Sequence, residues 1–290
     1  MSAASETGPD PPWGQMALDL YLLEQWDHNS SEVPAEQRKR LASAYVQLGW
    51  PGRKKYHQQI KRKEFTQPSD AAIESVLKPF RTPHQRHIAH YPGHVGCVWL
   101  RTAYGPGTDA LHEERTDFID WDMAIDDEDH LLNDRELYGF GTNWQDVFLV
   151  LPELLDVHHG HDESDEYYFG YQRYKIAHRE HSPDTLELLD GEEDPQERFR
   201  LEHHRIHRDY VANFVIVEDE EALRNGNVLL NFVDSQGQVV RQKRTNFDEA
   251  QMIGGMALEA AWDDMDAWRS GTVGERYREG GERGPPYDVD

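Results

Sequence analysis

The sequence has one cysteine among 290 residues and no long apolar run. A single thiol cannot form a disulfide within the chain, so Cys97, inside the apolar stretch VGCVWL, is expected to be a small core residue. The longest wholly apolar run, VFLVL at residues 147–151, is far shorter than the roughly 20 residues of a membrane-spanning helix. The N-terminus also lacks the basic start and apolar stretch of a secretory signal. We therefore expect a soluble intracellular protein with no membrane partner, located in the cytoplasm or, alternatively, in the nucleus.

Positive charge is scarce as well: 30 lysines and arginines stand against 55 aspartates and glutamates, giving a formal net charge of −25. This charge disfavours binding to nucleic-acid phosphates or anionic membranes over most of the surface, and it fits a basic protein partner better. The sequence contains no Gly-x-Gly-x-x-Gly or phosphate-loop pattern and no Gly-x-Ser-x-Gly elbow. The usual local signatures of nucleotide binding and of serine hydrolases are therefore missing.

The N-terminal part has the apolar periodicity of helices. The spacing predicts one helix across residues 13–29 and a second from Pro34, a favoured first helical residue, to just before Gly49. A third helix is expected across residues 53–64. A fourth is expected to begin at Ser69, whose hydroxyl can cap it, and to end before Pro79.

Strand-forming runs follow from about residue 94. We expect strands at residues 94–104, 166–178 and 210–219, and a hairpin over residues 227–244 around a turn at 234–237. Helices are expected at 195–209 and 248–268, and the second has a core-facing stripe of large side chains. That stripe contains Met252, Met256, Trp262, Met265 and Trp268.

These elements predict an α+β protein in which a helical N-terminal part is followed by a mainly antiparallel β-sheet with packed helices. We divide the chain into a disordered N-terminus at 1–12, a helical subdomain at 13–82, an α+β domain at 83–270 and a disordered C-terminal tail at 271–290.

Two histidine-rich segments are candidate halves of a metal site. His159 and His161 would point to one side of an extended segment, and Glu166 follows shortly after. His203 and His207 would share one face of a helix. If the two segments meet, imidazole and carboxylate ligands would suit a divalent metal such as zinc. The alternative is a polar loop, because the 16 histidines make about one His-x-His pair expected by chance.

The His-x-His-x4-Glu spacing of residues 159–166 resembles the first metal motif of the cupins, which are double-stranded β-helix barrels. The resemblance covers only these eight residues and implies His159, His161 and Glu166 as ligands. The sequence departs from the motif at Glu153, which stands where the cupins have glycine, and no second cupin motif follows.

Basic residues are concentrated in residues 35–64, with nine lysines and arginines against two glutamates. The paired basic clusters resemble a bipartite nuclear-import signal, and the two helices resemble a helix-turn-helix. This region could instead dock against the acidic segment 117–200 of the same chain. The basic patch comprises Arg53, Lys54, Lys55, Lys61, Arg62 and Lys63.

Our leading hypothesis from the sequence is a non-enzymatic binding or scaffold protein whose acidic half binds a basic partner. One alternative is a metal-dependent enzyme with a histidine and carboxylate site. A second alternative is nucleic-acid binding through the basic helices at 38–63, which the net charge makes the less favoured choice. The sequence assigns no catalytic residue and no organic cofactor.

Overall fold

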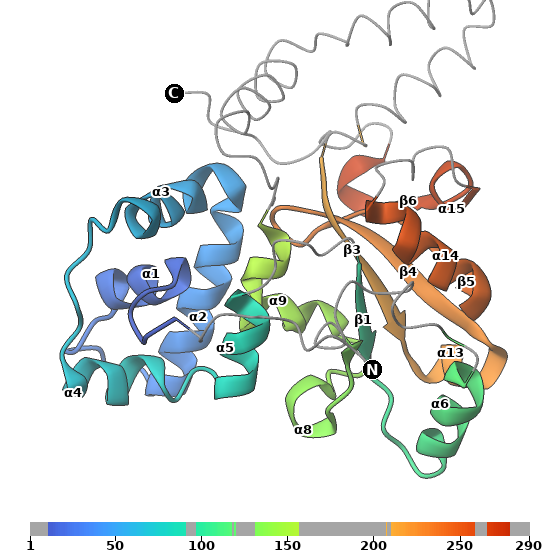
Figure 1. The fold of residues 1–290 in the computed structure, drawn as a ribbon, viewed down its shortest axis with the longest axis horizontal. Coiled ribbons are helices and arrows are strands. Elements are labelled where there is room, and N and C mark those ends of the chain that lie inside the picture. The colour runs from blue at the N-terminus through green and yellow to red at the C-terminus, as the bar shows by residue number, and fades with distance from the viewer. Residues whose placement is uncertain are drawn as a thin grey trace, which may run out of the picture. The chain divides into compact units, whose positions relative to one another are not determined.

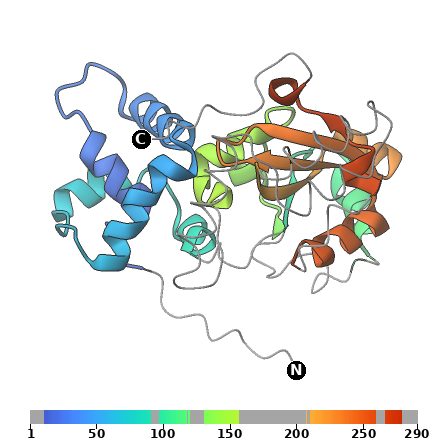
Figure 2. The ribbon, with the colours of Figure 1, turned by 90° about the horizontal axis from the view of Figure 1, so that it is seen from above.

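The computed structural model describes residues 11–90, 97–117, 119, 131–156, 207, 210–258 and 266–278. The described residues fall into two units, both drawn in Figures 1 and 2. The helical unit comprises residues up to 90 together with 147–154, and the sheet unit comprises the other described residues.

The helical unit confirms the four helices expected from the sequence of its N-terminal part. Its elements are α1 (Ala17–Gln25), α2 (Pro34–Gln47), α3 (Gly49–Arg62), α4 (Asp70–Ala72), the π-helical turn η1 (Ile73–Leu77), α5 (Pro83–His90), α9 (Val147–Val150) and the short 3-10 helix η5 (Pro152–Leu155).

Local chemistry places the ends of these helices. Pro34 is the first residue of α2. Gly49 lies two residues after the end of this helix and has a φ of 60°, a left-handed conformation that glycine adopts without steric cost. Gly49 also begins α3, four residues earlier than the sequence predicts. Ser69 caps α4 as expected, because its Oγ accepts a hydrogen bond from the amide of Ala72 over 3.2 Å.

Three tyrosine rings from three helices pack together in the core of the helical unit. The Tyr21 ring lies 5.1 Å from the ring of Tyr45 and 5.5 Å from that of Tyr56, centroid to centroid. Leu18 and Leu22, one turn apart on α1, are buried in the same cluster. The apolar face of α1 therefore packs against α2 and α3, as its periodicity predicts.

Two buried ion pairs join distant parts of the helical unit. Arg81 donates two hydrogen bonds, of 2.8 and 2.6 Å, to the carboxylate of Glu153. Arg86 Nη1 lies 2.9 Å from both carboxylate oxygens of Asp19. Glu153, which occupies the position of a glycine in the cupin motif, is thus a structural partner of an arginine in this protein.

The sheet unit contains, among the described residues, one six-stranded sheet in the order β2-β1-β3-β4-β5-β6. Neighbours β2, β1 and β3 run parallel, whereas β3, β4, β5 and β6 are antiparallel to one another in turn. The α+β class is confirmed, but the sheet is mixed rather than purely antiparallel. Its strands are β1 (Val98–Arg101), β2 (Leu131–Leu132), β3 (Val211–Glu218), β4 (Asn227–Asp234), β5 (Val239–Asn246) and β6 (Thr272–Val273).

The expected hairpin is present as β4 and β5, and Gly237 in its turn has a φ of 74°. Helices α14 and α15 pack on these two strands and cover the core of the sheet unit (Figure 1). The helical elements of this unit are α6 (Thr108–Thr116), α8 (Arg135–Tyr138), η4 (Trp144–Asp146), α13 (Glu220–Asn225), α14 (Phe247–Leu258), α15 (Asp266–Arg269) and η7 (Glu275–Tyr277).

The stripe predicted over residues 248–268 is correct at one end only. Trp268 is buried in the core, but Met252 is 52% exposed, because the neighbouring Ile253 takes the core-facing position. The side chains of Met256, Trp262 and Met265 lie outside the described part of the chain, as do the strand expected at 166–178 and, except for residue 207, the helix expected at 195–209.

Residues 271–278, which we assigned to a disordered tail, form β6 and η7. The buried Tyr277 donates its hydroxyl hydrogen to Asp234 over 2.5 Å, which joins this segment to the hairpin turn.

Candidate functional site: a polar pocket beyond the parallel strands

Three parallel strands end at the same edge of the sheet. Arg101 is the last residue of β1, Glu218 is the last residue of β3, and Asn133 directly follows β2. The register pairs Arg101 with Glu218 on adjacent strands. In open sheets with parallel strands, ligands commonly bind beyond the carboxyl ends of those strands. The fold therefore favours this edge as a binding site.

The fully buried carboxylate of Glu218 accepts hydrogen bonds from two rings. Trp99 Nε1 donates to Oε2 over 3.2 Å, and His112 Nδ1 lies 2.8 and 2.9 Å from the two carboxylate oxygens. A buried carboxylate is costly unless donors surround it. These two bonds hold the carboxylate and fix the orientation of the His112 imidazole on α6.

A chain of hydrogen bonds continues from His112 to Arg101 through Asn133. Asn133 Nδ2 lies 3.1 Å from His112 Nε2, and Arg101 Nη1 donates to Asn133 Oδ1 over 3.4 Å. Because a guanidinium has only donors, the amide oxygen must face Arg101 and the amide nitrogen must face the imidazole. His112 therefore accepts at Nε2 and donates from Nδ1, so every bond in the chain points from Arg101 toward Glu218.

The Arg101 guanidinium is the charged end of this network, and its side chain is only 4% exposed. It donates to the carbonyl of Ala103 and to Thr108 Oγ1, each over 3.1 Å, and it pairs with Asp109 Oδ1 at 2.5 Å. Its central carbon lies 4.6 Å from the centroid of the Tyr104 ring. A buried arginine needs such partners, and they hold it rigidly at the edge of the sheet.

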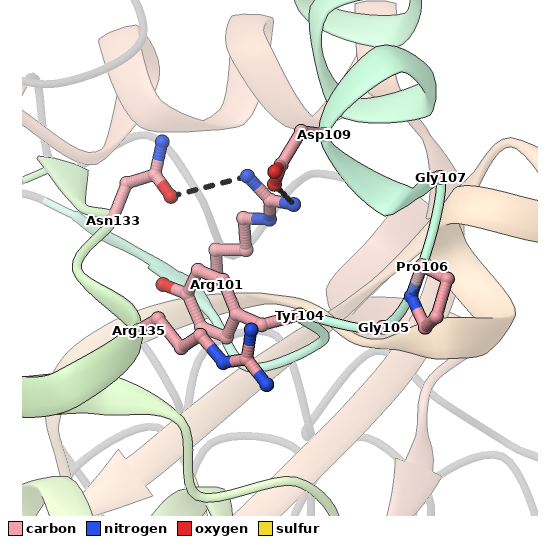
Figure 3. Close-up of a pocket in the computed structure, with 8 residues that line it drawn as sticks. All are labelled: Arg101, Tyr104, Gly105, Pro106, Gly107, Asp109, Asn133 and Arg135. Atoms are coloured by element: carbon pink, nitrogen blue, oxygen red, sulfur yellow. Dashed lines mark hydrogen bonds and ion pairs between the residues drawn. The ribbon is translucent and has the colours of Figure 1, made fainter.

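A pocket of about 580 Å³ opens in front of this arginine (Figure 3). This volume is within the usual range for small-molecule sites, about 300–1,000 Å³. One wall is the Gly-Pro-Gly turn between β1 and α6, where Gly107 has a φ of 78° that favours glycine. The pocket is lined by Arg101, Tyr104, Gly105, Pro106, Gly107, Asp109, Asn133 and Arg135.

Two of the lining side chains present hydrogen-bond donors that no described residue accepts. The hydroxyl of Tyr104 is buried without a hydrogen-bond partner. Burial raises the pKa of this hydroxyl well above its usual value, so at neutral pH it remains a donor. Arg135 extends from the start of α8 toward the same loop, and in the described residues its guanidinium has no acceptor (Figure 3).

The side chains that line the pocket carry more positive than negative charge, although the protein is strongly acidic. Two guanidinium groups, Arg101 and Arg135, face one carboxylate, Asp109. Two further carboxylates, Asp134 and Glu218, lie close enough to act on the Tyr104 hydroxyl, and Asp134 Oδ1 also caps α8 by accepting bonds from the amides of residues 136 and 137. Because hydrogen-bond donors exceed acceptors among the lining side chains, the pocket suits an acceptor-rich anion that contacts the two guanidinium groups.

The predicted metal site falls mostly outside the described residues, where His159, His161, Glu166 and His203 lie. His207 is described and buried, with Nδ1 3.5 Å from Arg241 Nη2 and its ring 5.5 Å from that of Tyr277. No group of three or more potential metal ligands occurs within the described ranges. Whether the two histidine segments meet therefore stays a prediction.

The predicted basic patch is only partly a surface feature. Arg53 is fully buried, and its Nη1 donates to the carbonyl of Val46 over 3.1 Å, so this residue belongs to the core of the helical unit. Lys54 is half-buried. The exposed members are Lys55, Lys61, Arg62 and Lys63, all in or directly after α3.

The network at the strand ends was not among the candidates from the sequence. Its members are too far apart along the chain to form a motif. A signal does exist, since Arg101 and Glu218 each follow three apolar residues at the end of a buried strand. A charged residue at the carboxyl end of such a strand can serve as a general indicator of a site.

Comparisons with known proteins give no assignment. No family model matches the chain, and searches of curated proteins and of solved structures find no significant match. Among the helices that the structure describes, none has the length and apolar character to cross a membrane. The function must therefore be argued from the pocket itself.

Proposed function

We propose that this protein is a binding protein that takes up a small molecule with a carboxylate or phosphate group in the pocket beyond β1, β2 and β3. The observation that carries the proposal is the buried, protonated hydroxyl of Tyr104, which has no acceptor and lies in the same pocket as Arg101 and Arg135. A buried donor without an acceptor is costly, and an anionic ligand supplies the missing acceptor.

Binding is favoured over catalysis by the state of His112. Both of its ring nitrogens are engaged, one with Glu218 and the other with Asn133. The imidazole therefore has no nitrogen directed at a ligand in the pocket, as a general base would need. This proposal keeps the non-enzymatic binding class expected from the sequence but replaces the expected basic protein partner with a small anionic ligand in this pocket. The basic protein partner and the cytoplasmic or nuclear location remain expectations from the sequence.

The test is a thermal-shift and calorimetric screen of small carboxylates and phosphorylated compounds. A ligand at about 100 times its dissociation constant stabilises the protein by about 2.7 kcal/mol, which gives a measurable rise in Tm. Arg135→Ala and Tyr104→Phe should each reduce the affinity for the active compounds. Arg224→Ala is the matched control, because Arg224 is an exposed arginine outside the pocket. Equal binding by all four proteins would contradict the proposal.

Nucleic-acid binding through α3 is a second candidate, supported by the exposed Lys55, Lys61, Arg62 and Lys63. It predicts binding to DNA or RNA that weakens with added salt and disappears when the three lysines are neutralised. Absence of binding at low salt would exclude it.

A metal-dependent enzyme using His159, His161 and a carboxylate is the third candidate, which rests on the sequence alone. Protein purified without an affinity tag should then contain near-stoichiometric zinc, iron or manganese, and His161→Ala should lose it.

A further inference from the structure

We infer that Asp109 is an internal competitor for the ligand: its carboxylate occupies, on Arg101, the position that the anionic group of the ligand takes when it binds. This inference rests on the proposed function and specifies which bond the ligand replaces.

The first step of the argument is the charge balance at Arg101. Three of the groups that accept its hydrogen bonds are neutral, namely the Ala103 carbonyl, Thr108 Oγ1 and Asn133 Oδ1. Among the described residues, Asp109 supplies the carboxylate that pairs with this buried guanidinium. A buried cation requires a nearby anion, and Asp109 provides it in the ligand-free protein.

The second step is the mobility of that carboxylate. The Asp109 side chain is 82% exposed, whereas the Arg101 side chain is 4% exposed. Among the described residues its one side-chain hydrogen bond is the bond to Arg101 Nη2. An exposed carboxylate in a single ion pair is weakly held, because water competes for it. Asp109 can therefore rotate into solvent, while Arg101 stays fixed by its neutral partners.

The third step is the shared location. Arg101, Asp109, Tyr104 and Arg135 all line the same pocket, and Figure 3 shows the Asp109 carboxylate directed at the outer nitrogens of Arg101. An anion that accepts from Tyr104 and Arg135 enters the region in front of Arg101. The Asp109 carboxylate and the anionic group of the ligand cannot both contact Arg101 Nη2 without strong electrostatic repulsion. The ligand and Asp109 therefore exclude one another.

The exchange also explains the class of ligand. A carboxylate reproduces the contact that Asp109 makes, and a phosphate offers further oxygens for Tyr104 and Arg135. Neutral polar molecules replace Asp109 less well, since they would leave the buried guanidinium without a directly paired carboxylate.

The experiment compares wild-type protein with Asp109→Asn. Asparagine keeps an oxygen that can accept from Arg101 but removes the competing charge. Calorimetric titrations use inorganic phosphate and acetate as separate probes, which distinguishes the two ligand chemistries. Removing a like charge at contact distance should strengthen binding of the preferred probe by at least about fivefold. The matched control is Glu114→Gln, an exposed acid on the same helix that does not line the pocket. It changes the net charge equally and should leave the affinity unchanged.

Three other outcomes would overturn the inference. Equal affinities in Asp109→Asn and Glu114→Gln would show that only net charge matters. Weaker binding in Asp109→Asn would show that Asp109 positions Arg101 for the ligand instead of competing with it. In both cases the proposed function survives, because the probe still binds. Failure of both probes to bind any of the three proteins would overturn the proposed function as well.

Discussion

Substitution of Glu218 by glutamine should break the hydrogen-bond network at the strand ends. Every hydrogen bond in the chain from Arg101 through Asn133 and His112 is donated toward Glu218. Glu218 is its terminal acceptor and receives hydrogen bonds from Trp99 and His112. Glutamine has one oxygen and one amide nitrogen in place of two oxygens. If the oxygen stays opposite Trp99, it also lies 2.9 Å from His112 Nδ1 and can accept from both rings, but the new amide then lies against Nδ1, donor to donor.

The mismatch cannot be resolved by a change of tautomer. Moving the hydrogen to His112 Nε2 places it against the Asn133 amide nitrogen. Rotating that amide then places its nitrogen against Arg101, which has only donors. One donor is therefore left without an acceptor, and that donor is buried at the His112–Glu218 end but only part-buried at Asn133. Such a loss costs about 1–3 kcal/mol, out of a total stability of about 5–15 kcal/mol for an ordinary domain.

Urea denaturation followed by tryptophan fluorescence measures this cost. The control is Glu220→Gln, in the next helix, because Glu220 is 78% exposed in a surface pair with Arg224 and should change stability by less than about 0.5 kcal/mol. Nitrogen NMR of His112 adds an independent measurement, with the hydrogen expected on Nδ1 in the wild-type protein. Equal stability of the two variants, or a hydrogen on Nε2 in the wild type, would refute the reasoning.

Three further predictions concern the structural framework. Glu153→Gln should cost about 3–5 kcal/mol in urea unfolding, because it leaves the buried guanidinium of Arg81 without its counter-charge. Partial burial alone would raise the pKa of Asp219, but hydrogen bonds from Arg244 and from backbone amides lower it below its usual value. Its contribution to stability is therefore present at neutral pH and is lost as the pH falls through that lowered pKa, below about pH 4, so Asp219→Asn should flatten the acid side of the stability profile. Burial raises the pKa of Cys97 to about 12, so its thiol should react with a disulfide reagent at mild alkaline pH only after unfolding.

Each of these predictions has a result that would contradict it. A loss below about 1 kcal/mol in Glu153→Gln would show that the ion pair is not an important buried contact. Parallel acid profiles for wild type and Asp219→Asn would remove Asp219 from the groups that set acid stability. Fast labelling of Cys97 in folded protein, at the rate of the urea-unfolded protein, would show that the thiol is accessible.

The starts of α2 and α4 and the hairpin turn could be predicted from the sequence because they depend on neighbouring residues. Pro34 begins a helix through its fixed φ, Ser69 caps one through its own hydroxyl, and Gly237 supplies the positive φ of a hairpin turn. The physics at each position involves only a few residues along the chain. The α+β class followed from these elements for the same reason.

Side-chain burial was less predictable, because one-dimensional spacing does not show which face of a helix meets a partner. Arg53 appeared to belong to an exposed basic surface but is buried and bonded to Val46. Met252 appeared to belong to the core but is half-exposed. In both cases packing against other elements decided the orientation.

The candidate site was determined by tertiary structure alone. Arg101 and Glu218 become neighbours through the parallel pairing of β1 with β3, and Asn133 joins them through β2. Pairing between strands so distant in sequence depends on how the whole sheet assembles, and no local pattern encodes it. The sequence by itself therefore determined the local elements, the acidic charge and the class of fold, whereas the pocket exists only because the folded sheet brings these strand ends together.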